Sequence, residues 1–270
     1  MKNLITLGAD PEVMVFNTVT GKITSVAGLL GCSKHKKKSL GKGVRLQEDN
    51  VLAEFDIDPC TDFETFDDLI GKGIDGIRRR IKKLGMGVAE DVCSHSFTQA
   101  ELETFHESAF EFGCEPDYNG VTGFRNPKPY SSDEGLRSAG GHIHIGWSHL
   151  GTVTPQIQAR MVAMCDLYLG IPSLFMDSDS RRRELYGQAG ACRFKDYGIE
   201  YRTLSNFWIF RQETRRWAWE QAHKAYEAAT NEELFLAVRE KVNPNLVQFI
   251  INSGDTKKAR HFLKSSGVKL

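Results

Sequence analysis

The sequence lacks the features that mark a membrane-bound or exported protein. None of its apolar runs is long enough to cross a bilayer. The acidic residues Asp10 and Glu12 follow the first residue too closely for a signal peptide. The six cysteines are scattered without a C-x-x-C pair, which argues against a structural zinc site and favours reduced thiols. Cys114 has no partner motif for a thiol nucleophile and is expected to be inert. We therefore expect a cytoplasmic protein with no membrane contact.

The sequence also lacks an excess of charge of either sign. Its 35 basic and 35 acidic residues give a formal net charge of zero, whereas nucleic-acid-binding domains usually carry a basic excess. Nucleic acid is therefore not expected as a partner. The phosphate-binding pattern G-x-x-x-x-G-K-[ST] is absent as well, because the segment "GKGVR" has the wrong spacing. Any nucleotide must then be bound by another kind of site.

The first half of the chain predicts mainly strands. Residues 3–16 alternate loosely between apolar and polar side chains and predict one strand, with residues 21–29 as its hairpin partner. Residues 32–45 have no apolar periodicity and predict a loop. Residues 46–57 predict a further strand.

Helices are predicted where apolar residues recur at helical spacing. One begins with Thr61 or Asp62 as its N-cap and stops at Gly85, and another opens at Pro155. A long aromatic-rich helix is expected over residues 206–229. The remaining predicted elements are strands at 140–146 and 197–205, a long loop at 113–137, and two or three short helices from Asn231.

This order of elements predicts an α+β fold with a largely antiparallel, curved sheet. The polar concave face of the sheet is expected to form an active site, and the helices are expected to pack on its other face. No internal repeat or long linker divides the chain. We therefore expect a single catalytic domain over residues 1–270, with a helical C-terminal segment from about residue 206.

Polar side chains at a spacing of two recur on four of the predicted strands. A spacing of two places such side chains on one face of a strand. Each set alone also fits a simpler interpretation, such as a solvated edge or a structural ion pair, but four together suggest one polar cavity. Clustered carboxylates repel each other unless cations lie between them, and carboxylates suit Mg²⁺ or Mn²⁺. The four sets are Asp10 with Glu12, Glu48 with Asn50 and Glu54, His142 with His144, and Glu200 with Arg202.

Basic residues gather before and within the last of these strands. Arg181, Arg182, Arg183, Arg193 and Arg202 fall in a short span, and the planar guanidinium group matches phosphate oxygens. Metal-bound carboxylates facing arginines are typical of phosphoryl transfer. The alternative is that at least two of the first three arginines face solvent. The run "KHKKK" in the 32–45 loop is interpreted as a solvated loop rather than as a clasp for an anionic substrate.

Five segments resemble the glutamine synthetase and glutamate–cysteine ligase superfamily. The resemblance is strongest to its phage-type branch, the carboxylate–amine ligases or amidoligases. It extends from about residue 8 to residue 206, and no motif follows residue 210. The segments occur in the family's order: "GADPEVMVF", "QEDNVLAEF", "SAGGHIHIG", "AGACRF" and "YGIEYRTLSN".

This resemblance implies a glutamine synthetase-like catalytic fold and a set of roles. The first and last motifs imply Asp10, Glu12 and Glu200 as metal ligands. The "SAGGHIHIG" strand implies His142 as a metal ligand and His144 near nucleotide phosphates. The middle acids are spaced differently from the family pattern, so Glu48, Asp49 and Glu54 all remain candidates, with Glu48 and Glu54 preferred as metal ligands. The residues expected to bind or act on ATP and the transferred group are Arg193, Arg202, Glu54 and Arg183.

The implied activity is an ATP-dependent ligase that forms an amide bond through an acyl-phosphate intermediate. ATP and Mg²⁺ or Mn²⁺ are the expected cofactors, and the expected partners are small-molecule or peptide carboxylates and amines. Two alternatives stay open. One is a metal-dependent hydrolase that uses the His and acid cluster, and the other is a non-catalytic nucleotide-binding relative. If the protein is phage-encoded, the expected cytoplasm is that of the host cell.

Overall fold

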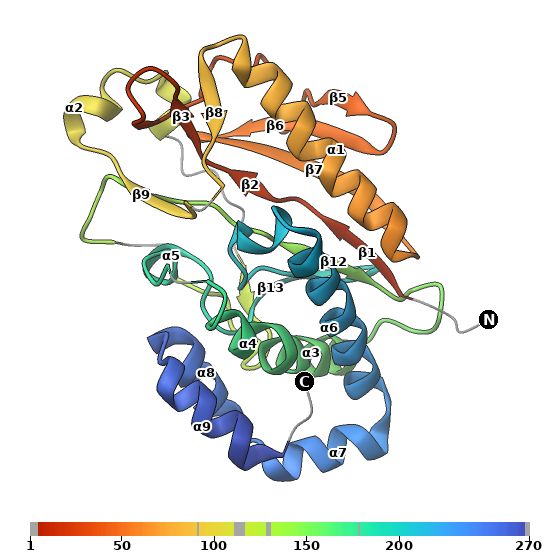
Figure 1. Ribbon diagram of the computed structural model, residues 1–270. Coiled ribbons are helices and arrows are strands. Elements are labelled where there is room, and N and C mark those ends of the chain that lie inside the picture. The colour runs from red at the N-terminus through yellow and green to blue at the C-terminus, as the bar shows by residue number, and fades with distance from the viewer. Residues whose placement is uncertain (1–4, 91, 111–116, 128–130, 178, 268–270) are drawn as a thin grey trace.

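The computed structural model describes residues 5–90, 92–110, 117–127, 131–177 and 179–267 (Figure 1). Its centre is an open, antiparallel sheet with nine strands in this described part of the chain. Strands from the two halves of the chain meet where β1 pairs with β12. The α+β fold class and the largely antiparallel sheet are thus confirmed. The path across the sheet is β10 (Tyr118–Asn119), β13 (Ala191–Lys195), β14 (Gly198–Tyr201), β12 (Ile143–Gly146), β1 (Thr6–Ala9), β7 (Leu52–Cys60), β6 (Val44–Asp49) and β5 (Lys38–Gly41), and β2 (Glu12–Val13) pairs with β7.

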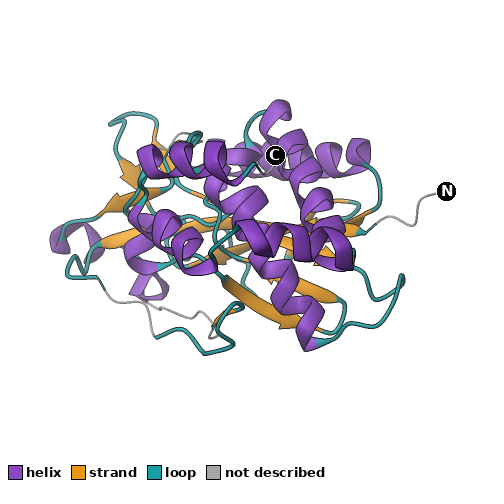
Figure 2. Ribbon diagram, turned by 90° about the horizontal axis from the view of Figure 1, so that it is seen from below, coloured by secondary structure: helices purple, strands orange, loops and turns teal. Residues whose placement is uncertain are grey.

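Three long helices cover one face of this sheet (Figures 1 and 2). Helix α1 (Phe63–Lys82) packs on β6 and β7, and α3 (Pro155–Cys165) packs on β13 and β14. Helix α6 (Gln212–Thr230) contacts both α1 and α3. The side chains of Leu7 and Ile143 are completely buried in the core on this side. Because successive strand residues point to opposite faces, the neighbouring polar residues are left on the uncovered face.

Helix caps fix where α1 and α3 begin. The Asp62 side chain accepts a hydrogen bond from the Thr65 backbone amide, so Asp62 rather than Thr61 is the N-cap of α1. Helix α1 ends at Lys82, before the expected stop at Gly85. Helix α3 opens at Pro155 as predicted. It continues into a fully buried π-helical turn, η2 (Asp166–Gly170).

The single strand expected over residues 3–16 is wrong. The structure divides it into β1, β2 and β3 (Val15–Asn17). Pro11 lies at the first break, and proline has no backbone N–H to donate to a ladder. The hairpin partner is confirmed only as the short strand β4 (Ile23–Thr24), which pairs with β3.

The strand expected over residues 46–57 is instead a hairpin of β6 and β7. Asn50 makes the turn with φ +54°, the left-handed conformation that asparagine tolerates better than most residues. The expected loop over residues 32–45 is also wrong in part, because β5 and the start of β6 fall within it. A strand at a sheet edge needs little apolar periodicity, and β5 is such a strand.

The helical C-terminal segment is confirmed, but the helix expected over 206–229 is interrupted. A 3₁₀ turn, η3 (Asn206–Ile209), precedes α6. The expected short helices from Asn231 are α7 (Glu232–Lys241), α8 (Pro244–Ser253) and α9 (Thr256–Ser266).

All five cysteines in the described ranges are buried free thiols, and Cys114 lies outside the described residues. No helix in the described residues has the length and apolar character needed to cross a membrane.

Smaller elements extend the fold around this framework. They are β8 (Met86–Val88), β9 (Ser94–Ser96), α2 (Gln99–Leu102), η1 (Glu107–Phe110), β11 (Leu136–Ser138), α4 (Ile171–Ser173) and α5 (Arg182–Leu185).

Candidate active site

A cavity of about 310 Å³ opens on the polar face of the sheet. Below we call it the charged cavity. All four strand segments that carry polar residues in the sequence contribute to it, so the expected convergence is observed. Its lining residues are Asp10, Glu12, Lys34, Lys37, Gln47, Glu48, Asp49, Glu54, His142, His144, Arg193, Lys195, Glu200 and Arg202.

Strand register places the central side chains in one row across the sheet. His144 is paired with Gly8 on one side and with Glu200 on the other, and Glu200 is paired in turn with Arg193. Directly opposed residues in a sheet point to the same face and lie close enough to interact. The row therefore places the His144 imidazole, the Glu200 carboxylate and the Arg193 guanidinium side by side. Gly8, at the end of the row, adds no side chain.

One group of potential metal ligands is Asp10, His144 and Glu200. Their ligand atoms all lie within 4.8 Å of each other. The His144 Nε2 is 3.1 Å from Asp10 Oδ1, and its Nδ1 is 2.5 Å from the Tyr197 hydroxyl. Asp10 Oδ1 is buried and has no hydrogen bond of good geometry among the described residues, despite this short approach. The group thus presents an unsatisfied buried acceptor to the cavity.

A second group comprises Glu12, Asp49 and Glu54, again with ligand atoms within 4.8 Å of each other. Burial, followed by the charge of Asp49, raises the pKa of Glu12 to about 7. Burial and neighbouring carboxylates, Asp10 first, also raise the pKa of Glu54 well above its ordinary value. Burial raises the pKa of Asp49 as well. Without a bound cation, burial and mutual repulsion therefore disfavour the ionised forms of these carboxylates.

Glu200 has the opposite surroundings. It contacts the Arg202 guanidinium, and its carboxylate lies 3.0 Å from Arg193 and 3.1 Å from Lys195. Burial and Asp10 oppose ionisation, but Arg202 and the two imidazoles outweigh them, and the pKa of Glu200 is lowered to about 2. Glu200 is therefore ionised throughout the physiological pH range.

The two histidines differ in their contacts. His144, rather than His142, completes the ligand group with Asp10 and Glu200. His142 is 4% exposed, with its Nδ1 3.2 Å from Arg202 and 3.4 Å from Asp10. Burial and the charge of Arg202 lower the pKa of His142 to about 4. His142 is therefore a neutral imidazole in contact with Asp10 and Arg202.

Glu48 borders the charged cavity, but its carboxylate is committed elsewhere. It accepts hydrogen bonds of 2.6 Å from the backbone amides of Gly28 and Leu30. Asp49 takes the place expected for Glu48 in the acid group. The sequence contained the signal, because Glu48 has the same strand parity as the buried Leu46, whereas Asp49 has the opposite parity.

Arg183 was expected to bind ATP, but the structure places it elsewhere. It does not line the charged cavity, and its guanidinium donates to the Asp179 carbonyl. The neighbouring Arg182 is buried instead, and it donates to the backbone carbonyls of Arg202 and Thr203. These hydrogen bonds from Arg182 therefore fix the position of the backbone at Arg202.

Three lysines of the cavity were missed as site residues. Lys195 lies two residues from Arg193 on β13, so strand parity alone could have identified it. Lys34 and Lys37 come from the "KHKKK" run, and Lys37 forms an ion pair of 2.8 Å with Asp56. Both lysines are exposed, as expected for a solvated loop, and they also line the cavity.

Together the fold and the site define an α+β protein with a carboxylate-rich, cation-lined pocket. Residues 134–265 match the model of a family described as "Phage phiEco32-like COOH.NH2 ligase-type 2". This match supports the resemblance to the phage-type carboxylate–amine ligases that was found in the sequence. A comparison with curated proteins finds no match. The matched region includes β12, β13 and β14, whereas Asp10, Glu12, Asp49 and Glu54 precede it.

Proposed function

We propose that the protein is an ATP-dependent ligase that forms an amide bond between a carboxylate and an amine through an acyl phosphate. One observation carries the proposal: two groups of metal-type ligands and a set of basic side chains line the same cavity. Divalent metals beside arginines are a recurring arrangement for moving a phosphoryl group. A general carboxylate–amine ligase is already indicated by the family match.

The residues of the charged cavity fit divalent metal ions. Asp10 Oδ1 is a buried acceptor without a well-aligned donor in the described chain. Burial and then neighbouring carboxylates raise the pKa of Glu12 and of Glu54, and a bound cation would favour their ionised forms. Five carboxylates and one imidazole are the ligand types of Mg²⁺ or Mn²⁺ rather than of structural Zn²⁺. A bound metal would neutralise phosphate oxygens and polarise the phosphoryl group that is transferred.

The chain's own cations would balance the charge of the transferred group. Arg193 and Lys195 project from β13 beside Glu200. The position of Arg202 is fixed by its contact with Glu200 and by Arg182 behind it. Preorganised cations of this kind stabilise charge that develops during the reaction.

The lysines of the 32–38 segment would hold the anionic substrate at the other side of the cavity. Lys34 and Lys37 come from the loop that precedes β5. The reaction requires no nucleophilic side chain, because the amine attacks the activated carboxylate directly. Glu54 is the candidate to accept the amine proton, because its carboxylate lines the cavity.

The test is an ADP-release assay with Mg²⁺, ATP and a mixture of carboxylates and amino acids. We expect ADP release that requires both a carboxylate and an amine. Hydrolysis of an ester or peptide without ATP would instead support the metal-dependent hydrolase. Tight ATP binding without turnover on any substrate mixture would support the non-catalytic relative.

Matched arginine variants test the site itself. Arg193→Ala is expected to reduce ADP release by about 100-fold or more, as found when a transition-state-stabilising group is removed. Arg183→Ala removes the same side chain ten residues earlier and outside the cavity, so it is expected to retain nearly full activity. Equal loss in the two variants would contradict the placement of the site.

A further inference from the structure

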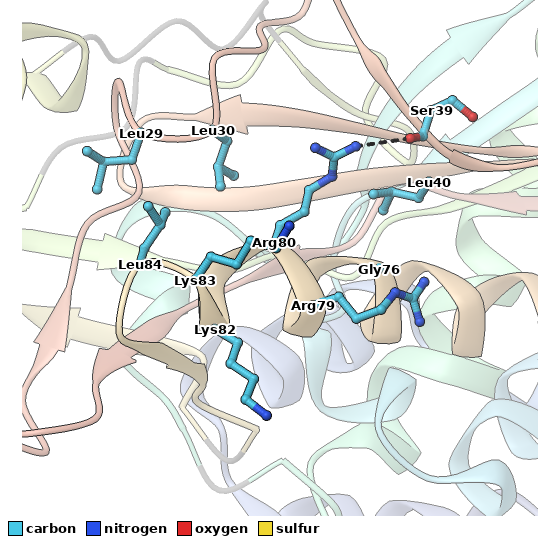
Figure 3. A pocket seen from close by; sticks show the side chains of 10 residues that line it. All are labelled: Leu29, Leu30, Ser39, Leu40, Gly76, Arg79, Arg80, Lys82, Lys83 and Leu84. Carbon is cyan, nitrogen blue, oxygen red and sulfur yellow. Dashed lines mark hydrogen bonds between the residues drawn. The ribbon is translucent and has the colours of Figure 1, made fainter.

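A second, larger hollow lies away from the charged cavity. It measures about 920 Å³ and runs between the C-terminal half of α1 and the two ends of the 29–40 segment (Figure 3). We call it the α1 groove. None of its lining residues also lines the charged cavity. They are Leu29, Leu30, Ser39, Leu40, Gly76, Arg79, Arg80, Lys82, Lys83 and Leu84.

The α1 groove is basic and uncompensated. Among the described residues that line it, four are Lys or Arg and none is acidic. Arg80 reaches across the groove and donates to the Ser39 carbonyl (Figure 3), and the other three basic side chains form no ion pair within the described ranges of the chain. Lys72, earlier on the same helix, does pair with Asp68. The unbalanced charge is therefore a local property of the groove in a chain whose net charge is zero.

Leucines accompany these cations. Leu29 is 50% exposed and Leu84 is 40% exposed, and they face each other across the opening in Figure 3. Cations at the end of a helix also stabilise its dipole, which accounts for basic residues in the last turn of α1. It does not account for two leucines left in water beside them.

The combination favours an acidic polypeptide over a nucleic acid. Proteins that hold single-stranded nucleic acid usually offer aromatic rings on which bases stack, and no aromatic residue is among the described residues that line the groove. Leucine side chains instead match the aliphatic side chains of a peptide. A volume of this size is sufficient for several side chains of an extended segment.

We propose that the α1 groove docks an acidic, leucine-containing segment of a partner protein. Carboxylates of the segment would pair with Arg79 and Lys83, and its apolar side chains would pack on Leu29 and Leu84. The segment between the two ends of the groove carries the two cavity lysines. A partner docked there would therefore contact both ends of the segment that carries Lys34 and Lys37, and its binding does not depend on ligase activity.

The test measures binding of a short fluorescent peptide that mixes glutamate and leucine, in the absence of ATP and divalent metal. We expect the Arg79→Glu/Lys83→Glu variant to bind at least about tenfold more weakly, a loss of about 1.4 kcal/mol. Lys72→Glu reverses a charge on the same helix outside the groove and should change binding little. Leu29→Ser should weaken binding without a change in charge. Replacing the peptide's glutamates with glutamine should abolish binding.

Several results would overturn the proposal. They are failure of the folded wild-type protein to bind the peptide, equal effects of the groove variant and Lys72→Glu, and equal binding of the glutamine peptide. Tighter binding of a short single-stranded DNA, weakened by the same groove variant, would assign the groove to nucleic acid instead. Because no ATP is present, each result is independent of whether the protein proves to be a ligase. Circular dichroism establishes that the exposed substitutions leave the fold intact.

Discussion

Glu54 and Glu200 are two buried carboxylates of one cavity with opposite electrostatic surroundings. Glu54 faces other acids, and its pKa is raised. Glu200 is held by three cations, and its pKa is lowered to about 2. The same change from glutamate to glutamine therefore has opposite consequences for stability at the two positions.

We predict that Glu54→Gln raises the unfolding temperature of the metal-free protein by a few degrees, because it removes a carboxylate that its neighbours repel. Glu200→Gln should lower the free energy of unfolding by about 3–5 kcal/mol, the usual cost of leaving buried charges without their partner. Both variants should lose ADP-releasing activity. Urea and thermal unfolding without divalent ions measure the contrast, and a shift of the same sign in both variants would contradict it.

The pH dependence of stability offers a separate test at Glu12. Its pKa is about 7 in the folded protein, against an ordinary value of 4.5. Between these values the folded state binds more protons than the unfolded state, so the stability linked to Glu12 falls as pH rises through 7. Glu12→Gln removes this loss. The variant should therefore gain stability relative to wild type between pH 5 and pH 8.

The measurement compares urea unfolding of wild type and Glu12→Gln at both pH values without divalent ions. The comparison cancels the opposing contribution of His142, whose pKa of about 4 makes the folded protein less stable at acid pH in both chains. A difference that is independent of pH would show that Glu12 does not titrate as the structure implies.

At the scale of elements, the sequence predicted whether a segment is a helix or a strand better than where that helix or strand begins and ends. Helix α1 was predictable because its isoleucines recur at helical spacing and Asp62 caps it. The hairpin of β6 and β7 was not, because its turn depends on one asparagine in a left-handed conformation. The break after β1 was marked in the sequence by Pro11, but a loose alternation of apolar residues concealed it. These boundary errors explain why Glu48 was preferred to Asp49.

Two glycines of α1 give a matched prediction on packing. A Cβ at Gly73 would lie 2.2 Å from ring carbons of Phe55, whereas a Cβ at Gly71 would have no neighbouring atom within 4 Å. Gly71→Ala should therefore stabilise the protein by about 0.5–1 kcal/mol through helix propensity. Gly73→Ala should destabilise it by about 1–3 kcal/mol through overpacking.

Chemical denaturation measures the free energy of unfolding of Gly71→Ala and Gly73→Ala and so tests the predicted difference between them. Equal changes in the free energy of unfolding would mean that α1 does not approach β7 as closely as described. Activity should persist in Gly71→Ala, because the substitution adds a methyl group in open space away from the charged cavity.

At the scale of the whole molecule, the site depends on both halves of the chain. The family match begins at residue 134, whereas Glu12, Asp49 and Glu54 lie on β2, β6 and β7. Residues 1–270 are proposed to form one catalytic domain because strands of both halves join in a single sheet, where β1 pairs with β12. Sequence motifs named most of the candidate residues, but only the tertiary pairing of β2 with β7 shows that Glu12 lies opposite Glu54.

Divalent metal should therefore stabilise the whole chain. At a Mg²⁺ or Mn²⁺ concentration 100 times its dissociation constant, we expect the free energy of unfolding to rise by about 2.7 kcal/mol. Glu12→Gln and Glu200→Gln should each reduce this gain, although they come from opposite halves of the sequence. Arg183→Ala is the control and should keep it. Thermal unfolding across a metal titration measures the effect, and an unchanged gain in both glutamine variants would contradict the assignment of the ligands.

The row of residues from Gly8 through His144 and Glu200 to Arg193 also sets how the sequence can change in length. Deleting one residue within β12 would turn His144 toward the core and bring an isoleucine into the cavity, because strand side chains alternate. The same deletion would shift the pairing with both neighbouring strands. Natural or engineered insertions and deletions are therefore expected in the connections at the strand ends, while β1, β12, β13 and β14 should keep a constant length.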